Sequence, residues 1–280
     1  VSGSPEASIE VQRKFSVLVA SSPERAAFIL SKVAKYGERK KFLKNFTYQK
    51  IELDVNKIRE FLSGKKKLDE YETREILRLA GLSVVEERIV QREEEAVKAG
   101  KEIGYPLVMK IISPDIFHKT ELGLVKMRIE NEEGIIRAFH EIMDAVKKKA
   151  PEATIRGISL QKMVKEGVEL IAGFTEDNVF GKILLFGSGG IATELYRDVS
   201  IRIPPLSIEE IKEMINEPKI SKFWNDGFRG KRFDSEKVER VISVLSEIAV
   251  QFPEIKELEI NPFILNSDGA FIVDALCVLR

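Results

Sequence analysis

The chain alternates between segments with helical and with strand-like hydrophobic spacing. Apolar residues recur every three to four positions, which predicts amphipathic helices, over residues 68–82, 92–106, 132–149, 207–215 and 234–252. Short apolar runs bounded by turn residues predict strands, at residues 107–112, 124–130, 155–164, 168–177 and 181–190. Because strand pairs are mixed with helices, the pattern favours an α+β fold arranged in lobes over a regular β-α-β winding.

The first 67 residues are expected to form an extension ahead of the main domain. Ser22 followed by Pro23 and Glu24 predicts the start of a helix, and apolar residues at helical spacing follow. Gly64 precedes three lysines and marks an expected boundary. We therefore place the main domain from Leu68 onward.

Composition narrows the choice of partners. Hydrophobic residues make up 44% of the chain, enough for a sizeable core, and 45 basic residues balance 45 acidic ones. Because the net charge is zero, neither nucleic acid nor a membrane is an expected partner, and local groups must hold any anionic ligand. No apolar run approaches the roughly 20 residues that span a bilayer, and the first residues lack a signal-peptide apolar region. The 32% of charged residues favours a thermophilic source.

The chain contains one cysteine, Cys277. A single cysteine excludes an intrachain disulfide and a cysteine metal cluster. We therefore expect a reducing, cytoplasmic compartment.

The last 25 residues predict a β-hairpin that carries oxygen ligands. Two apolar runs are joined by an Asn-Ser-Asp-Gly turn, and a four-residue loop there pairs Leu265 with Ala270. Antiparallel partners keep a constant index sum, so Asn261 is expected opposite Asp274, with Glu259 on the same face as Asn261. Such oxygen ligands suit Mg²⁺, whereas a solvated sheet face is the alternative. A carboxylate inside FIVDALCVL needs a partner, which favours the metal.

Two further features are candidates for binding phosphate. Lys110 interrupts the apolar strand LVMKII, so it must either emerge at the strand end or meet an anion such as a nucleotide phosphate. The FGSGG segment follows a predicted strand, and Gly187, Gly189 and Gly190 can offer backbone N–H groups to phosphate oxygens. Its spacing matches neither a P-loop nor GxGxxG, and a purely structural turn is the alternative.

The two histidines differ in their surroundings. His118 lies within IISPDIFHKTELGLVKM, just beyond a predicted strand. Its residue type leaves open a general acid or base, a metal ligand and a nucleophile, and a neutral imidazole can attack a phosphoryl group near pH 7. His140 borders the apolar face of a predicted helix, where we expect a structural or surface role.

Four motifs in a fixed order carry a family resemblance over residues 68–280: YPLVMKIISPDIFHKTELGLVKM, LQKMVKEGVELIAG, FGSGGIATELYRDVSIRIPPL and ELEINPFILNSDGAFIVDA. They resemble the ATP-grasp portion, or β subunit, of the NDP-forming acyl-CoA synthetases, typified by archaeal ADP-forming acetyl-CoA synthetase. The resemblance implies a two-lobed ATP-grasp fold with lobes at 68–162 and 163–280. Residues 1–67 resemble the tail of a CoA-ligase domain.

The resemblance also implies a role for each candidate residue. Lys110 contacts ATP or ADP phosphates, and Asn261 and Asp274, near Glu259, bind Mg²⁺. His118 occupies the position of a relay on a swinging loop, through which phosphate passes by way of phosphohistidine. The nucleotide base and ribose are contacted by an interlobe strand and the residue beyond it, namely Gln161, Lys162, Met163 and Glu169.

The implied reaction converts acyl-CoA, ADP and phosphate to carboxylic acid, ATP and CoA. It needs a CoA-binding α subunit that carries the principal phosphorylated histidine and brings acyl-CoA and phosphate, with α2β2 as the expected assembly. Leu124 stands where the family usually has glycine, and Glu121 where it has aspartate. A side chain at 124 would restrict the approach of phosphate to the backbone. Two alternatives stay open: a carboxylate–amine or carboxylate–thiol ligase without phosphohistidine, and a non-catalytic nucleotide-sensing subunit.

Overall fold

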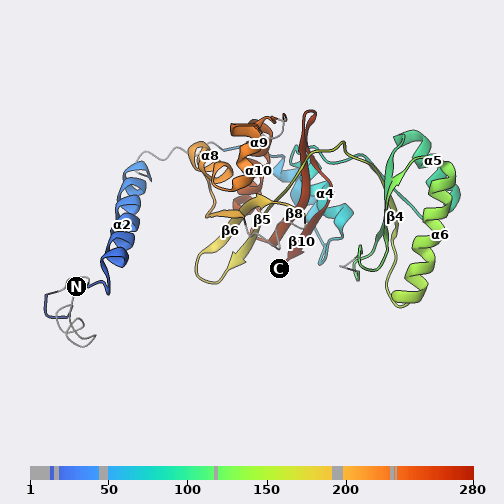
Figure 1. Ribbon diagram of the computed structural model, residues 1–280. Coiled ribbons are helices and arrows are strands. Elements are labelled where there is room, and N and C mark those ends of the chain that lie inside the picture. Colours follow the sequence, from blue (N-terminus) through green and yellow to red (C-terminus); the bar gives the residue numbers. More distant parts are fainter. Residues whose placement is uncertain are drawn as a thin grey trace. The chain divides into compact units, whose positions relative to one another are not determined.

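The computed structural model describes residues 13–15, 19–43, 50–116, 119–190, 198–227, 230 and 232–280. The chain divides into two compact units, Val1–Tyr48 and Gln49–Arg280. Figure 1 shows the ribbon of both units. Within the described ranges, no helix is long and apolar enough to cross a membrane.

In the N-terminal unit, helix α2 (Pro23–Leu43) begins where the sequence predicts. The backbone N–H of Arg25 donates to Ser22 Oγ at 3.2 Å, so Ser22 caps the first turn. Several large apolar side chains of this helix are exposed: Phe28, Leu30, Val33 and Tyr36.

In its described residues, the larger unit contains two antiparallel sheets and the helices that cover them. In chain order its elements are α3 (Val55–Leu62), α4 (Glu70–Leu79), β1 (Glu87–Val90), α5 (Glu93–Ile103), β2 (Leu107–Ile112), β3 (Val125–Ile129), α6 (Glu132–Lys149), β4 (Gly157–Lys162), β5 (Val168–Asp177), β6 (Gly181–Ser188), β7 (Val199–Arg202), α8 (Ile208–Asn216), η1 (Lys219–Ser221), α9 (Lys222–Asn225), α10 (Ser235–Gln251), β8 (Ile255–Asn266), β9 (Gly269–Ile272) and β10 (Ala275–Leu279).

The first sheet has the strand order β1-β4-β2-β3 and two chemically different faces. Apolar side chains such as Met109, Ile111 and Leu160 pack with α5 and α6 in one buried core, and Figure 1 shows these helices beside β4. Successive side chains of a strand alternate between faces, so Lys110 and its cross-strand partner Ser159 lie on the face opposite that core. The lysine inside LVMKII therefore belongs to a polar sheet face.

The second sheet has the order β10-β8-β5-β6-β7, with β9 paired to β8. One face packs with α8 and α10 in the larger core, which also includes Ile58 and Leu62 of α3 and Leu77 of α4. Because α3 contributes to this core, the compact unit starts at Gln49, ahead of the expected main-domain start at Leu68. The division into lobes at residue 162 stays a prediction.

The terminal hairpin has the predicted register. Leu265 pairs with Ala270, and Ala275 of β10 pairs with Ile260, which keeps the same index sum. The loop is shorter than expected, because Asn266 and Gly269 themselves pair. Asn266 Oδ1 accepts the backbone N–H groups of Asp268 and Gly269, and these bonds hold a two-residue turn.

Candidate functional site

Lys110 of β2 meets Asp274 of the terminal hairpin. Lys110 Nζ lies 3.1 Å from Asp274 Oδ2 and donates to the Val273 carbonyl at 3.4 Å. The lysine side chain is 5% exposed, whereas a third of the Asp274 side chain is reached by solvent. Of the two outcomes that the sequence left open for Lys110, the structure has the lysine meeting an anion.

Sequence reasoning missed Arg74, a fully buried arginine on α4. Its Nε and Nη2 donate to the two carboxylate oxygens of Glu87 at 2.9 and 2.7 Å, and its Nη1 donates to Asp274 Oδ1 at 3.0 Å. Arg74 lies three residues before buried Leu77, hence on the apolar side of a predicted helix. That position was the one signal in the sequence that could have revealed it.

Lys119 is a third buried cation, in addition to Lys110 and Arg74. Lys119 Nζ lies 2.5 Å from Glu70 Oε2, in the first turn of α4. Three cations and three carboxylates therefore gather where α4, the first sheet and the hairpin meet. We call this set the central charge cluster; its members are Glu70, Arg74, Glu87, Lys110, Lys119 and Asp274.

In the central charge cluster, burial and pairing with opposite charges shift the pKa values of Lys110 and Asp274 in opposite directions. Burial lowers the pKa of Lys110, which favours loss of its proton, while Asp274 acts in the opposite direction. Burial raises the pKa of Asp274, but Lys110 and Arg74 outweigh it and leave this pKa below its usual value. Burial followed by the charge of Asp274 raises the pKa of Glu70. Asp274 is thus held as a carboxylate beside two cations.

The structure brings the side chains of two predicted metal ligands together. Asn261 Nδ2 donates to Glu259 Oε1 at 3.3 Å, and the Asn261 N–H donates to the Asp274 carbonyl at 3.1 Å. Asn261 Oδ1 accepts the Gly190 N–H at 3.5 Å. Hence Gly190 and the three predicted ligands belong to one region of the second sheet.

The described residues offer a partial shell for a cation. No three His, Cys, Asp or Glu side chains among them are grouped so as to hold a metal ion. One ionised carboxylate with an amide oxygen nearby is a donor set that suits Mg²⁺, which keeps several waters and is completed by substrate phosphates. The donor chemistry of Asp274 and Asn261 therefore fits this ion.

The glycine-rich segment is only partly a turn. Gly187 lies inside β6 and pairs with Ile171 on one side and Val199 on the other, so the expectation of a loop at this position is wrong. A side chain there would collide with the neighbouring strand backbone, which explains the glycine. Gly189 and Gly190 follow the strand, and the Gly189 N–H donates to the Glu169 carbonyl at 2.8 Å.

The predicted interlobe strand lies at the end of β4, and residues 163–167 lead from the first sheet to the second. The Met163 N–H donates to the Pro106 carbonyl at 3.0 Å, and Lys162 Nζ donates to the Tyr105 carbonyl at 2.7 Å. Gln161 is buried, and its Nε2 donates to Glu87 Oε2 at 3.2 Å. Its side chain therefore serves the central charge cluster.

His118 lies outside the described residues, but the chain around it is placed. Leu124 is fully buried in the core of the first sheet, and its N–H donates to the Lys119 carbonyl at 2.9 Å. Lys110 projects from the opposite face of that sheet. The side chain of Leu124 therefore takes no space at the central charge cluster, and the expected restriction of phosphate approach to the backbone stays a prediction.

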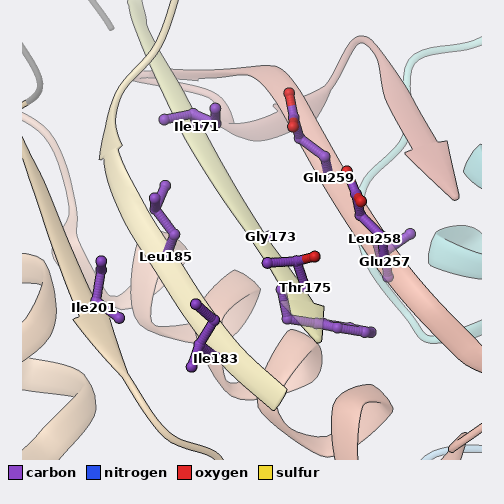
Figure 2. Close-up of a pocket in the computed structure, with 10 residues that line it drawn as sticks. Ile171, Gly173, Thr175, Ile183, Leu185, Ile201, Glu257, Leu258 and Glu259 are labelled. Carbon is purple, nitrogen blue, oxygen red and sulfur yellow. The ribbon is translucent and has the colours of Figure 1, made fainter. Parts of the chain in front are cut away.

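A hollow lies on the second sheet, on the face away from its core (Figure 2). Gly173 forms its floor, and Ile171 and Leu185 stand beside it as apolar walls. Glu259 lines the same hollow and also contacts Asn261. The hollow thus adjoins the predicted metal ligands.

The comparison with known families decides the fold family. Residues 61–279 match the profile of the ATP-grasp domain family. The chain belongs to this family. The α+β fold and the family expected from the four motifs are therefore confirmed.

Its relatives are acyl-CoA synthetases. The ATP-grasp chain is 40% identical over 229 residues to the β subunit of ADP-forming acetate–CoA ligase I of Pyrococcus furiosus, covering 80% of this chain and 99% of that subunit. It is 31% identical over 283 residues to the ADP-forming acetate–CoA ligase of Methanocaldococcus jannaschii, covering 94% of this chain and 39% of that longer protein.

A solved structure agrees. The acetyl-coenzyme A synthetase 1 of Candidatus Korarchaeum cryptofilum, in complex with coenzyme A and Ca-AMPCP, has a TM-score of 0.74 and 40% identity. The match covers 81% of this ATP-grasp chain and 98% of that chain. The same enzyme is known with Mg-AMPPCP and a phosphohistidine segment pointing towards the nucleotide binding site.

Proposed function

We propose that this ATP-grasp chain is the nucleotide-binding β-type subunit of an ADP-forming acyl-CoA synthetase. With its partner it converts acyl-CoA, ADP and phosphate to carboxylic acid, ATP and CoA. The observation that carries the proposal is the 3.1 Å contact between Lys110 and Asp274, which come from different sheets. Each was predicted separately, one as a phosphate contact and the other as a Mg²⁺ ligand.

In this proposal, the cationic side chain binds the phosphates, and the carboxylate and amide side chains bind the metal ion. Lys110 binds the nucleotide phosphates, and its desolvated ammonium group attracts them more strongly than an exposed one would. Asp274 and Asn261 hold Mg²⁺, with Glu259 supporting the amide. When bound, the ion neutralises phosphate charge. With the phosphates bound, Lys110 would pair with them in place of Asp274, whose carboxylate would then be available to the ion.

The surrounding backbone positions the rest of the nucleotide. Gly190 offers its N–H to the phosphates, with Gly189 as the adjoining glycine whose N–H is held by the Glu169 carbonyl, while Gly187 lets the neighbouring strands pair closely. The segment Gln161, Lys162 and Met163 runs along the adenine, and Glu169 reaches the ribose. The position of Glu169, exposed and beside Gly190, supports this role.

The partner is a CoA-binding α subunit with a phosphorylated histidine, assembled as α2β2 in the cytoplasm. Two relatives support a partner. The relative that this chain covers almost completely is itself a β subunit, and in another relative the matching part is 39% of a longer protein. His118 relays the phosphoryl group between the partner and the nucleotide. Acyl-CoA and phosphate bind through the partner.

The reconstituted reaction tests the proposal. The chain and an α-type partner are incubated with acetyl-CoA, ADP, phosphate and Mg²⁺, and ATP is measured. We expect ATP from the mixture and none from either chain alone. Mg-ATP binding without any phosphoryl transfer in the complex would instead favour a nucleotide-sensing subunit.

The relay is tested separately with His118→Ala. We expect loss of ATP formation with nucleotide binding retained, and labelling of His118 by an acid-labile, base-stable phosphate in the unsubstituted complex. ATP formation that persists in the variant contradicts the relay. An acyl phosphate formed without phosphohistidine would favour the carboxylate–amine or carboxylate–thiol ligase.

A further inference from the structure

Arg74 joins three parts of the molecule through one guanidinium group. It projects from α4, binds Glu87 of β1 through two donors, and reaches Asp274 of the terminal hairpin with the third. The Arg74 side chain is fully buried, so its two contacts with Glu87 are shielded from water, while its contact with the one-third exposed Asp274 is partly shielded. An arginine is always protonated and its fork is rigid, which makes these contacts strongly directional.

Glu87 is fixed independently of Arg74. Its Oε2 accepts Ser159 Oγ at 2.9 Å and Gln161 Nε2 at 3.2 Å, both from β4. Glu87 therefore cannot turn without breaking bonds to a neighbouring strand. Arg74 is held to the first sheet at one end and directs its remaining donor at the second sheet.

Both oxygens of the Asp274 carboxylate are engaged. Oδ1 accepts Arg74 Nη1 and the Ala275 N–H, each at 3.0 Å, and Oδ2 pairs with Lys110. If Lys110 turns to nucleotide phosphates, Arg74 is the cation that keeps Asp274 oriented. A metal-binding carboxylate depends on such a partner for its orientation.

We propose that Arg74 is a positioning residue for the Mg-nucleotide complex. It acts through Asp274, whose carboxylate it holds in the orientation that Mg²⁺ requires, and it transmits the position of the first sheet to that ligand through Glu87. This inference rests on the proposed function of Asp274 and Lys110. It assigns a role to a residue that contacts neither the nucleotide nor the ion.

The test compares two affinities in each variant of the full chain. Calorimetry measures the Kd of ATP with excess Mg²⁺ and the Kd of ATP with EDTA. The ratio of the two is the factor by which Mg²⁺ raises the affinity for ATP, which we call the gain. Arg74→Lys keeps the charge but cannot bind Glu87 and Asp274 together. We expect the gain to fall by about 10–100-fold while the affinity for metal-free ATP is unchanged.

Arg78→Met is the matched control, because Arg78 lies on the same helix, pairs with Glu75 and has Nη2 3.8 Å from Glu87 Oε1. Its gain should equal that of the unsubstituted chain. The double variant Arg74→Met with Glu87→Met removes both buried charges together, which avoids leaving one unpaired and protects the fold. It should lose the gain as Arg74→Lys does.

The outcomes separate this inference from the proposed function. A folded Arg74→Lys or double variant that keeps the full gain overturns the positioning role, as does an equal loss in Arg78→Met. If Mg²⁺ does not raise the affinity of the unsubstituted chain for ATP, that result contradicts the proposed Mg-nucleotide site itself, and the positioning role of Arg74 with it.

Discussion

The Cys277 thiol lies in the core beneath the second sheet, and burial raises its pKa to about 12. In the unfolded chain the thiol ionises near pH 8.5, so only the unfolded state releases a proton between these values. The stability from this group is fully present below about pH 8.5 and is lost as pH rises towards 12.

We predict a pH-dependent difference between the unsubstituted chain and Cys277→Ala. Above pH 8.5 the unfolding free energy of the unsubstituted chain should fall faster, by about 1.4 kcal/mol per pH unit. Denaturant unfolding at pH 8.0, 9.0 and 10.0 measures it. Parallel curves for both proteins would mean that the thiol ionises while folded.

Individual residues differ in how far the sequence reveals them. Lys110 and Asp274 were predictable because each interrupts an apolar run, where an unpaired charge is costly. Glu87 lies in a segment rich in charge, where nothing local distinguishes it from solvated side chains, and only its place on the apolar side of a predicted helix distinguishes Arg74. Their pairing depends on tertiary contacts between α4 and β1, which periodicity does not encode.

At the scale of elements, Gly173 controls how closely β5 and β8 pair beside Glu259. A Cβ at this position would lie 2.5 Å from the Leu258 carbonyl oxygen and 2.9 Å from Glu259 Cα. Both are backbone atoms, so the strands would have to move apart. The same movement would displace the part of β8 that carries both Glu259 and Asn261.

We therefore predict that Gly173→Ala lowers the unfolding free energy by about 1–3 kcal/mol, the usual cost of overpacking. Thr175→Ala is the control, because Thr175 is exposed two residues along the same strand and its truncation should change stability by less than about 0.5 kcal/mol. Urea unfolding measures both. Equal stability of the two variants would show that the strands accommodate the methyl group.

Most helices and strands followed from the sequence, whereas strands β1 and β7 and helix α3 did not. Helix α6 and strand β5 have the predicted bounds, because strong periodicity and caps such as Asn131 set their ends. Strands β1 and β7 have four residues each, too few for a period to stand out. Helix α3 was missed because the lysine run after Gly64 suggested a boundary.

At the scale of the molecule, the charge cluster and both sheets belong to residues 49–280, whereas α2 belongs to the N-terminal unit. The ATP-grasp match also begins inside the larger unit, at residue 61. The family followed from four ordered motifs, while the start of the compact unit did not, since it depends on how α3 packs.

We predict that removing residues 1–48 leaves the Mg-ATP affinity of the remainder unchanged. The larger unit contains its own two cores and every proposed nucleotide contact. Circular dichroism checks the fold of the truncated chain, and calorimetry compares its Kd with that of the full chain. A folded truncated chain with weaker binding would place part of the site in residues 1–48.

The central claim is that Lys110 and Asp274 form the site for nucleotide phosphates and Mg²⁺. Calorimetric titration of Mg-ATP into the full chain and into Lys110→Met tests it most directly. Lys182→Met is the control, because burial also lowers the pKa of Lys182, and this lysine contacts the Phe252 carbonyl. The account predicts binding by the unsubstituted chain and by Lys182→Met, and an affinity about tenfold lower or worse for Lys110→Met, a loss of about 1.4 kcal/mol. Equal affinities for all three proteins would contradict it.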